Sequence, residues 1–442
     1  MTQVKPYSAS AWSEVETWPR ERLVRLQLEK LREQLARVGR DNAYYRRRFA
    51  ECGFDPRGLD SVDDLRALPL TRKEDYAASI AAQPPWGEFV AVPQAQVRRL
   101  HFSSGTTTRP TPQFWTAQDL ARWADIYARG AYSQGAREGD IFQCLFTYTW
   151  FAGGLGATAG YERLGATVIP AGSGETERQI EVLFEHGTTV ACGTPSFALY
   201  LAEVAERLGR DLRQSRVRRI MVGGEPGASL PATRARIEER WGAKCYDAYG
   251  SLEFQSIAWD CEQQAGLHLF EDFSIAEIVD PDSGAPVADG QPGVLVLTHL
   301  DKQAGPLVRW WTGDVVVRDA RPCACGRTHS RLIGGVLGRA DDMLVVRGVN
   351  LFPSAIEELV RAQAQATGEY LIVLDRDVVE EGSGLLSGIK LKVEVHPGAP
   401  ASFAADLADS IRARLKVRAL VESVAAGTLP RATHKAKRVQ RL

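Results

Sequence analysis

Short apolar segments alternate with helical stretches between residues 118 and 245, and this alternation restricts the fold more than any other feature of the chain. Three of these segments, at 166–170, 189–193 and 219–224, have the length and composition of buried strands. Strands separated by helices pair in parallel, because the helix carries the chain back across the sheet before the next strand begins. We therefore expect an α/β fold with a parallel sheet in the middle of the chain.

The regions on either side have different patterns. Apolar residues recur at helical spacing within residues 12–50, and hairpin-like strands are expected between 270 and 320. A length of 442 residues exceeds what a single core usually supports. We predict a large N-terminal α/β domain of several subdomains over residues 1–338, and a small mobile α+β domain over 339–442. The second domain would have the order β-α-β-β-α-β, and the glycine and charged residues at 338–342 would form an exposed hinge.

Composition excludes several classes of protein. A formal net charge of -1 gives no electrostatic reason to expect binding to nucleic acid or to a membrane surface. The first residues lack the apolar core of a signal peptide, and there is no apolar stretch of about 18 residues that could span a bilayer. Seven cysteines are too few and too scattered for a secreted disulfide scaffold. These features predict a cytoplasmic enzyme.

A run of small and hydroxylated residues lies between two short apolar segments, and it is the first candidate for chemistry. Residues 103–111 read Ser-Ser-Gly-Thr-Thr-Thr-Arg-Pro-Thr, between apolar 100–102 and 113–115. Such a run cannot pack a core, but its backbone N–H groups and hydroxyls can surround an anion. It predicts a hairpin loop that holds a polyphosphate, although clusters of this kind are usually ordinary loops. The loop lacks the Gly-Lys pair of a P-loop kinase, which argues against that enzyme class.

Several further motifs follow this loop along the chain: Gly223-Gly224-Glu225-Pro226, Tyr249-Gly250-Ser251-Leu252-Glu253, Thr312-Gly313-Asp314, the segment 338–354, and Leu429-Pro430-Arg431 with Lys435 after it. Any one of these motifs is unspecific, but finding all of them in this order along the chain is specific. With the loop at 103–111, they are similar to those of the adenylate-forming (acyl-CoA synthetase) superfamily. The closest likeness is to its phenylacetate–CoA ligase branch, and it covers nearly the whole chain.

The resemblance implies a reaction in two steps. A carboxylate attacks the α-phosphate of ATP and expels pyrophosphate, and a thiol then displaces AMP from the acyl-adenylate. The implied function is that of an ATP-dependent aryl carboxylate–CoA ligase, with ATP, Mg²⁺ and coenzyme A as cofactors. The alternative is a stand-alone adenylation enzyme that passes the aryl group to a carrier-protein thiol, because both types share these motifs. The expected partners are a small aromatic carboxylic acid and coenzyme A, and a homodimer is left open.

The resemblance also implies the residue roles. Lys435 would lie beside the carboxylate and the α-phosphate during adenylation, with Lys437 as a rival cation, and Glu253 would bind Mg²⁺. The chain has Thr108 and His434 where the family usually has glycine. The remaining implied roles are phosphate binding by Ser103, Ser104, Gly105, Thr106 and Thr107, adenine binding by Gly224, Glu225, Pro226, Asp247, Tyr249 and Gly250, ribose or phosphate binding by Asp314 and Arg339, the hinge at Asp341, and the thiol channel at Gly348.

Three cysteines and a histidine form a possible metal-ligand set. Cys261, His268, Cys323 and Cys325 offer three thiolates and one imidazole, which suits tetrahedral zinc, and His329 is a rival for the fourth position. With four protein ligands such a site would be structural rather than catalytic. We expect the other cysteines to be small buried residues: Cys52, Cys144, Cys192 and Cys245. A non-catalytic zinc-stabilised binding module would require the loss of Glu253 or Lys435, and both are present.

The segment 146–154 resembles the acyl-pocket segment of the family and is rich in aromatic residues. Some of these rings are expected to pack in the core. If others face the site, then Tyr148, Trp150 and Phe151 would line a pocket for a flat, short acid. The sequence therefore predicts a benzoate-type or anthranilate-type acid, or phenylacetate, rather than a long fatty acid.

Overall fold

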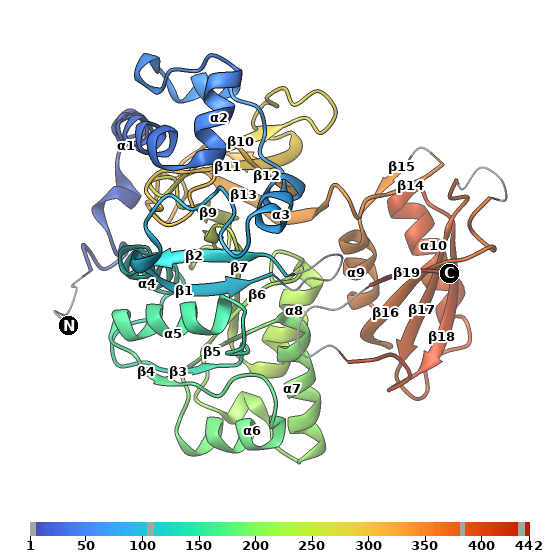
Figure 1. Cartoon of the computed structure of the whole chain (residues 1–442). Helices are drawn as coiled ribbons and strands as arrows, with labels where there is room; N and C mark the ends of the chain where they lie inside the picture. The colour runs from blue at the N-terminus through green and yellow to red at the C-terminus, as the bar shows by residue number, and fades with distance from the viewer. Residues whose placement is uncertain (1–5, 104–109, 348, 381–384, 432–437) are drawn as a thin grey trace.

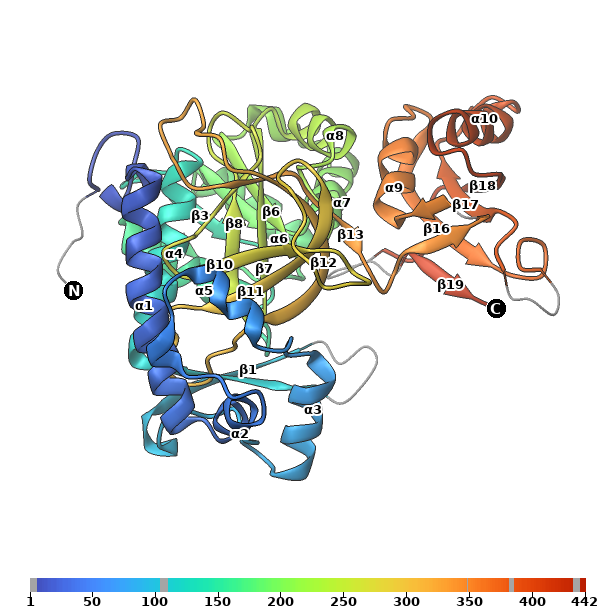
Figure 2. The ribbon, with the colours of Figure 1, turned by 90° about the horizontal axis from the view of Figure 1, so that it is seen from above.

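The computed structural model describes residues 6–103, 110–347, 349–380, 385–431 and 438–442. A large body contains one extended sheet, and a smaller body at the C-terminal end contains a second sheet (Figures 1 and 2). The larger sheet has the strand order β10-β11-β12-β13-β9-β8-β7-β6-β5-β3-β4. The chain thus has the α/β architecture that the sequence predicts.

One half of the large sheet is parallel, as expected from the alternating pattern. Its strands are β3 (Ile141–Cys144), β4 (Thr167–Ile169), β5 (Val190–Gly193), β6 (Arg219–Gly223) and β7 (Lys244–Ser251), and all four adjacent pairs are parallel. The helices of this half are α4 (Ala117–Ser133), α5 (Gly153–Leu164), α6 (Thr176–Glu185), α7 (Pro195–Arg207) and α8 (Pro231–Trp241). Because all these strands point the same way, their carboxyl ends meet at one edge of the sheet.

The other half is antiparallel, and it contains the hairpin-like strands expected between 270 and 320. Its strands are β8 (Gln255–Trp259), β9 (Leu267–Leu269), β10 (Ser274–Val279), β11 (Pro292–His299), β12 (Trp310–Asp319) and β13 (Arg331–Arg339). The N-terminal helices α1 (Arg20–Asp41), α2 (Ala43–Glu51) and α3 (Lys73–Ala82) share a hydrophobic core with this half. The expected hairpin around the 103–111 loop is β1 (Val97–Phe102) paired antiparallel with β2 (Pro112–Thr116).

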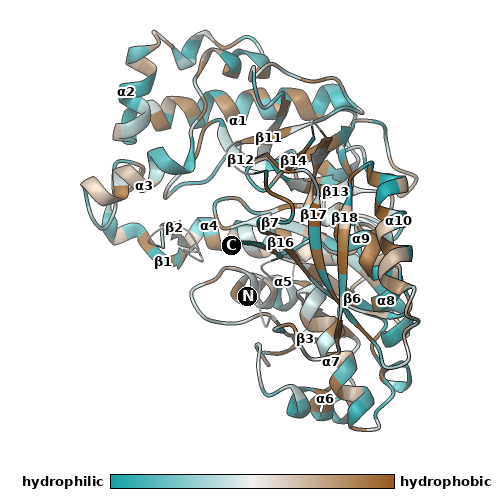
Figure 3. Ribbon diagram, turned by 90° about the vertical axis from the view of Figure 1, so that its right-hand side faces the viewer, coloured by the Kyte–Doolittle hydropathy of each residue, from teal (hydrophilic) through white to brown (hydrophobic). Residues whose placement is uncertain are grey.

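The smaller body has its own core and a four-stranded sheet of order β18-β17-β16-β19. Its elements are β14 (Leu344–Val346), β15 (Val349–Leu351), α9 (Pro353–Arg361), β16 (Ala366–Leu374), β17 (Ile389–Val395), α10 (Phe403–Leu415), β18 (Ala419–Ala425) and β19 (Val439–Arg441). The expected helices and strands are present, whereas β15 and β19 were not predicted. Peripheral helices such as α2 and α6 have interleaved hydrophilic and hydrophobic segments (Figure 3), as amphipathic helices do.

Helix α8 of the large body faces helix α9 of the small one (Figures 1 and 2). The backbone N–H of Ala232, in the first turn of α8, donates to both carboxylate oxygens of Glu358 at 3.1 Å. The guanidinium of Arg361 donates to Thr233 Oγ1 at 2.9 Å. The contact between α8 and α9 therefore includes polar groups, while Phe352 of the small body packs on an apolar cluster of the large sheet. Among the described helices, none is both long and apolar enough to cross a membrane.

Candidate active site

Two of the predicted nucleotide-binding motifs lie at the carboxyl ends of the parallel strands β6 and β7. Gly224 follows β6 with a φ of +90°, a backbone conformation that glycine adopts without strain. A side chain on Gly223 would begin 2.5 Å from the carbonyl oxygen of Ala248 in the neighbouring strand β7. The two glycines let the chain turn close against β7, at the sheet edge where α/β proteins bind ligands.

Tyr249, Asp314 and Arg339 come from strands β7, β12 and β13, and the structure joins them through one carboxylate. The Tyr249 hydroxyl donates to Asp314 Oδ2, and Arg339 Nη1 donates to Asp314 Oδ1 at 3.1 Å. Burial and the nearby Asp314 carboxylate raise the pKa of Tyr249, so its hydroxyl stays a donor at neutral pH. Three residues predicted separately from sequence thus form one hydrogen-bonded group.

Arg339 extends this group to the predicted hinge. Its Nε donates to Asp341 Oδ1 at 2.7 Å and its Nη2 donates to Asp341 Oδ2 at 3.0 Å. One guanidinium therefore contacts both Asp314 and the residue at which the chain passes into the smaller body. Gly338, just before it, lies under the ring of Phe352, where a Cβ atom would be only 2.3 Å from that ring.

Glu253 lies in the turn between β7 and β8, four residues after Tyr249 in the chain. In the described part of the chain, no hydrogen bond or ion pair engages its carboxylate, whereas its backbone carbonyl accepts from Lys302 Nζ at 3.3 Å. Gly250 closes the turn, because a Cβ there would be 2.1 Å from the carbonyl oxygen of Gln255. The carboxylate of Glu253 is thus available to a cation such as Mg²⁺, which prefers oxygen ligands.

The other two acidic candidates are already engaged by the backbone. Asp247 is buried, and its carboxylate accepts from Ser229 N at 2.9 Å and from Ala248 N at 3.0 Å. Burial raises its pKa, while these hydrogen bonds act in the opposite direction. Glu225 accepts from the backbone N–H of Ser196 at 2.7 Å, in the first turn of α7. Both side chains hold the loops around the strand ends in place. Pro226 continues the second of these loops.

The 103–111 loop is closed at its base. Ser103 Oγ lies 3.1 Å from Thr111 Oγ1 and accepts from Thr111 N at 3.0 Å, and Ser103 N donates to Thr111 O at 3.1 Å. These bonds extend the β1–β2 pairing to the start of the loop. The loop residues Ser104, Gly105, Thr106 and Thr107 lie outside the described residues, as do Gly348 and Lys435.

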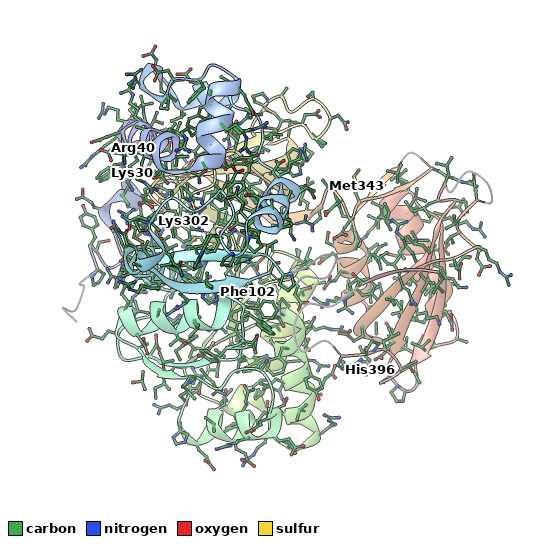
Figure 4. The ribbon with its side chains drawn as sticks, in the orientation of Figure 1. Lys30, Arg40, Phe102, Lys302, Met343 and His396 are labelled. Atoms are coloured by element: carbon green, nitrogen blue, oxygen red, sulfur yellow. The ribbon has the colours of Figure 1, made fainter. Side chains whose placement is uncertain are left out.

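The three aromatic candidates for the acid pocket differ in burial. The Tyr148 hydroxyl is 2.6 Å from Thr158 Oγ1, and its ring is partly buried. Trp150 is 67% exposed, and its backbone carbonyl accepts from the N–H of Phe102 at 3.1 Å. Phe151 is partly buried. The Tyr148 side chain is therefore held by a residue of helix α5. The Trp150 ring, in contrast, is largely open to solvent near the end of β1, where Phe102 lies (Figure 4).

The structure brings together the four metal-ligand candidates. The ligand atoms of Cys261, His268, Cys323 and Cys325 all lie within 4.8 Å of one another. Cys261 Sγ is 4.0 Å from Cys323 Sγ, and Cys325 Sγ is 3.5 Å from His268 Nε2. Tetrahedral zinc, with Zn–S of about 2.3 Å and Zn–N of about 2.0 Å, requires S–S and S–N separations of about 3.8 and 3.5 Å.

The rival ligand His329 is not part of this cluster. Its Nδ1 and Nε2 lie 3.0 and 3.1 Å from the carbonyl oxygens of Leu269 and Val15. Among the other cysteines, Cys144, Cys192 and Cys245 are buried as expected, but Cys52 is exposed. The expectation for Cys52 is wrong because it follows the end of the short surface helix α2, where its thiol contacts only that helix's carbonyl groups.

The chain matches two family models and several known proteins. The AMP-binding enzyme family matches residues 58–299, and the AMP-binding enzyme C-terminal domain matches residues 348–441. The phenylacetate-coenzyme A ligase of Thermus thermophilus is 40% identical over 86% of this chain and 83% of its own length. That of Pseudomonas putida is 38% identical over 93% of this chain and 92% of its own.

Solved structures extend the likeness to the whole chain. The crystal structure of 2-hydroxyisobutyryl-CoA ligase in the postadenylation state, in complex with 2-HIB-AMP, has a TM-score of 0.92 and 32% identity, covering 100% of this chain and 94% of that one. The same ligase with 2-HIB-AMP and CoA in the thioesterification state has a TM-score of 0.75 and 33% identity at the same coverage. With these matches and the motifs at the strand ends, the chain belongs to the AMP-binding enzyme family.

Proposed function

We propose that this chain is an ATP-dependent acid–CoA ligase that forms an acyl-adenylate and then an acyl-CoA thioester, with release of AMP and pyrophosphate. The observation that carries the proposal is the likeness over the whole chain to a CoA ligase solved with an acyl-adenylate. The relatives are named as CoA ligases, which favours free coenzyme A over a carrier-protein thiol as the acceptor.

The residues present fit the groups that this reaction requires. Asp314 would accept hydrogen bonds from the ribose hydroxyls, in an orientation fixed by Tyr249 and Arg339. Glu253 would be a Mg²⁺ ligand, and the bound ion would offset charge on the phosphates. Lys435 would stabilise the negative charge that develops at the α-phosphate when the carboxylate attacks.

The proposed substrate is a small aromatic carboxylic acid. Two relatives act by name on phenylacetate, and Tyr148 is held by Thr158 on the segment that resembles the acyl pocket. The similar 2-hydroxyisobutyryl-CoA ligase acts by name on a small branched acid. The test must therefore compare acids that differ in size and shape.

A panel of acids tests this function. Purified protein is incubated with ATP, Mg²⁺, CoA and one acid at a time: phenylacetate, benzoate, 2-aminobenzoate, 2-hydroxyisobutyrate or a long-chain fatty acid. AMP and acyl-CoA are followed by mass spectrometry. We expect both products with an aromatic acid. Fastest turnover with the fatty acid would overturn the substrate class, and absence of AMP with every acid would overturn the ligase.

We propose in addition that Cys261, His268, Cys323 and Cys325 hold a structural zinc ion, because their separations match tetrahedral coordination. Metal analysis of the purified protein should give one zinc per chain. Cys323→Ser should lose the zinc and lower Tm, whereas Cys245→Ser, a change at a buried cysteine outside the cluster, should keep it. Full Tm without bound zinc would contradict the site.

A further inference from the structure

Lys302 is a buried lysine in the connection between β11 and β12, and no sequence motif points to it. The residue is only 4% exposed. Its side chain extends into the large body rather than into solvent (Figure 4). A lysine in such a position is unusual, because removing an ammonium group from water is costly unless the group is paired.

The Lys302 ammonium links two parts of the proposed ATP site. Nζ donates to Gln113 Oε1 at 3.1 Å and to the backbone carbonyl of Glu253 at 3.3 Å. It also lies 3.7 Å from the centre of the Trp115 ring. Gln113 is the second residue of β2, just after the 103–111 loop, and Glu253 is the proposed Mg²⁺ ligand. One cation thus contacts both the strand that leaves the loop and the turn that carries Glu253.

No partner of this ammonium in the described part of the chain is a carboxylate: the contacts are an amide oxygen, a backbone carbonyl and an aromatic ring. Burial lowers the pKa of Lys302 to about 7, although the more distant carboxylates of Asp119 and Glu253 act in the opposite direction. Within the described residues, the Lys302 ammonium therefore has no direct carboxylate partner, and its hydrogen bonds go to the strand that follows the 103–111 loop and to the turn that carries Glu253.

In the described part of the chain, none of the other charged or titratable groups around Lys302 forms an ion pair with its ammonium. The Asp119 carboxylate accepts from the backbone N–H groups of Gln303 and Ala304 at 2.7 and 3.0 Å. Arg37, from α1, donates to the backbone carbonyl of Lys302. The ring of His299 stacks on Phe254 at 3.7 Å, and burial together with the Lys302 charge lowers its pKa well below the usual value, so it is neutral.

We propose that Lys302 is a positioning residue for adenylation. By bonding to both Gln113 and the backbone of Glu253, its ammonium fixes the strand that follows the 103–111 loop relative to the turn that carries the proposed Mg²⁺ ligand. This inference rests on the proposed ligase function. It adds to that function a residue that does not itself touch the substrate.

Lys302→Met, Lys302→Arg and Lys30→Met test the proposal. Lys30 is the matched control, because its ammonium also ties an element to this region, donating to Asp272 O at 2.7 Å and to Asp301 Oδ2 at 3.2 Å, whereas in the described part of the chain none of its hydrogen bonds goes to Gln113 or Glu253. Adenylation is followed by pyrophosphate release. Thioester formation is measured separately, from supplied acyl-adenylate and CoA.

We expect Lys302→Met to lower kcat/KM for ATP by at least about 10-fold, with KM for the acid and thioester formation changed less than about 3-fold. Lys302→Arg should restore most of the loss, and Lys30→Met should resemble the wild type. Equal losses in both half-reactions, or an equal effect of Lys30→Met, would show a merely structural role and overturn the proposal.

Lys302→Arg gives a second variant if Lys302→Met does not fold, because arginine keeps the positive charge but places its donors differently. The two half-reactions are measured in it separately, and a loss of equal size in both would overturn the proposal. AMP formation by the wild type is judged independently, so failure of the ligase function would be recognised separately.

Discussion

At the residue scale, Asp314 is the carboxylate through which several of the predicted site residues are joined. Its two carboxylate oxygens accept from Tyr249 and Arg339, and Arg339 in turn contacts Asp341. An aspartate turned by two donors presents its remaining lone pairs in a fixed direction, which is what recognition of a pair of ribose hydroxyls requires.

Asp314→Ala should therefore impair ATP use more than a simple loss of charge would. The change removes the ribose acceptor and leaves the Tyr249 hydroxyl and the Arg339 guanidinium without that partner, so we expect kcat/KM for ATP to fall by about 100-fold or more. Steady-state kinetics with ATP as the varied substrate measures it. Asp289→Ala, which removes an exposed partner of Arg318, is the control. A loss below about 3-fold would contradict the role of Asp314.

Sequence reasoning found the residues that stand in motifs but not the ones that support them. The sequence indicates Asp314, Tyr249 and Arg339 because their neighbours form recognisable patterns, and the structure joins these three residues. No motif surrounds Lys302 or Glu358. Their proposed roles follow from hydrogen bonds with residues that are distant in the chain, Gln113 and Ala232. Only the fold reveals that Lys302 is buried, since nothing in the local composition separates it from an exposed lysine.

At the element scale, helices α4 and α5 pack so closely that glycine is required at their contact. A Cβ on Gly160 of α5 would be 2.3 Å from Cβ of Tyr127 in α4. Glycine inside a helix is normally about 1 kcal/mol less favourable than alanine, so its presence here reflects packing rather than helix propensity. These two helices lie beside the segment that carries Tyr148, whose hydroxyl contacts Thr158 of α5.

Gly160→Ala should consequently destabilise the protein despite the better helix propensity of alanine. Overpacking of this kind costs about 1–3 kcal/mol, which should appear as a lower Tm in thermal unfolding. Gly153→Ala is the control in the same helix, because a Cβ there would lie 3.5 Å from the Phe146 ring, at ordinary contact distance. A Tm for Gly160→Ala equal to or above that of the wild type would contradict the packing argument.

The elements predicted best were those with strong local patterns. The parallel strands β4, β5 and β6 are continuous apolar runs, so their sequence alone distinguishes them from the helices between them. Strands β15 and β19 have three residues each, and β19 exists as a strand only because it pairs in parallel with β16. Short strands of this type depend on a partner that is distant in sequence, which a local pattern cannot reveal.

At the scale of the whole molecule, the two bodies are arranged more as in one of the similar ligase structures than as in the other. The TM-score is 0.92 to the ligase structure in the postadenylation state and 0.75 to the structure in the thioesterification state. In the arrangement found here, the contact between α8 and α9 includes hydrogen bonds from Ala232 to Glu358 and from Arg361 to Thr233. Polar contacts of this kind are common between domains of one chain.

Another contact between the bodies involves the segment that leads to Lys435. Arg431 Nη1 lies 2.9 Å from Oε2 of Glu394, which is fully buried, and Arg431 Nε lies 3.7 Å from Glu203 Oε2 in α7 of the large body. On the other side of residues 432–437, Arg438 pairs with Glu369 at 2.7 Å. The chain on both sides of Lys435 is thus anchored by ion pairs, and one of these, Arg431 to Glu203, crosses between the bodies.

Reversing the charge at Glu203 should therefore slow adenylation selectively. In Glu203→Lys, repulsion of Arg431 disfavours the arrangement found here, so we expect pyrophosphate release to slow by about 3- to 10-fold, in keeping with a partly exposed pair. Thioester formation from supplied acyl-adenylate and CoA should be unchanged or faster, because the variant weakens only a contact of the arrangement found here. Rapid-quench measurements of the two half-reactions distinguish these effects.

Glu206→Lys provides the matched control for this experiment, because Glu206 lies one turn further along α7 and pairs with Arg240 of the same body at 3.9 Å. The two variants carry the same charge change on the same helix, but of these two residues only Glu203 forms an ion pair with Arg431, whereas among the described residues Glu206 reaches the small body only through an electrostatic interaction with His396. Equal rates for the two variants would mean that the pair does not hold the bodies together. Slower thioester formation in Glu203→Lys would mean that this pair supports the second step, which the likeness to the postadenylation structure argues against.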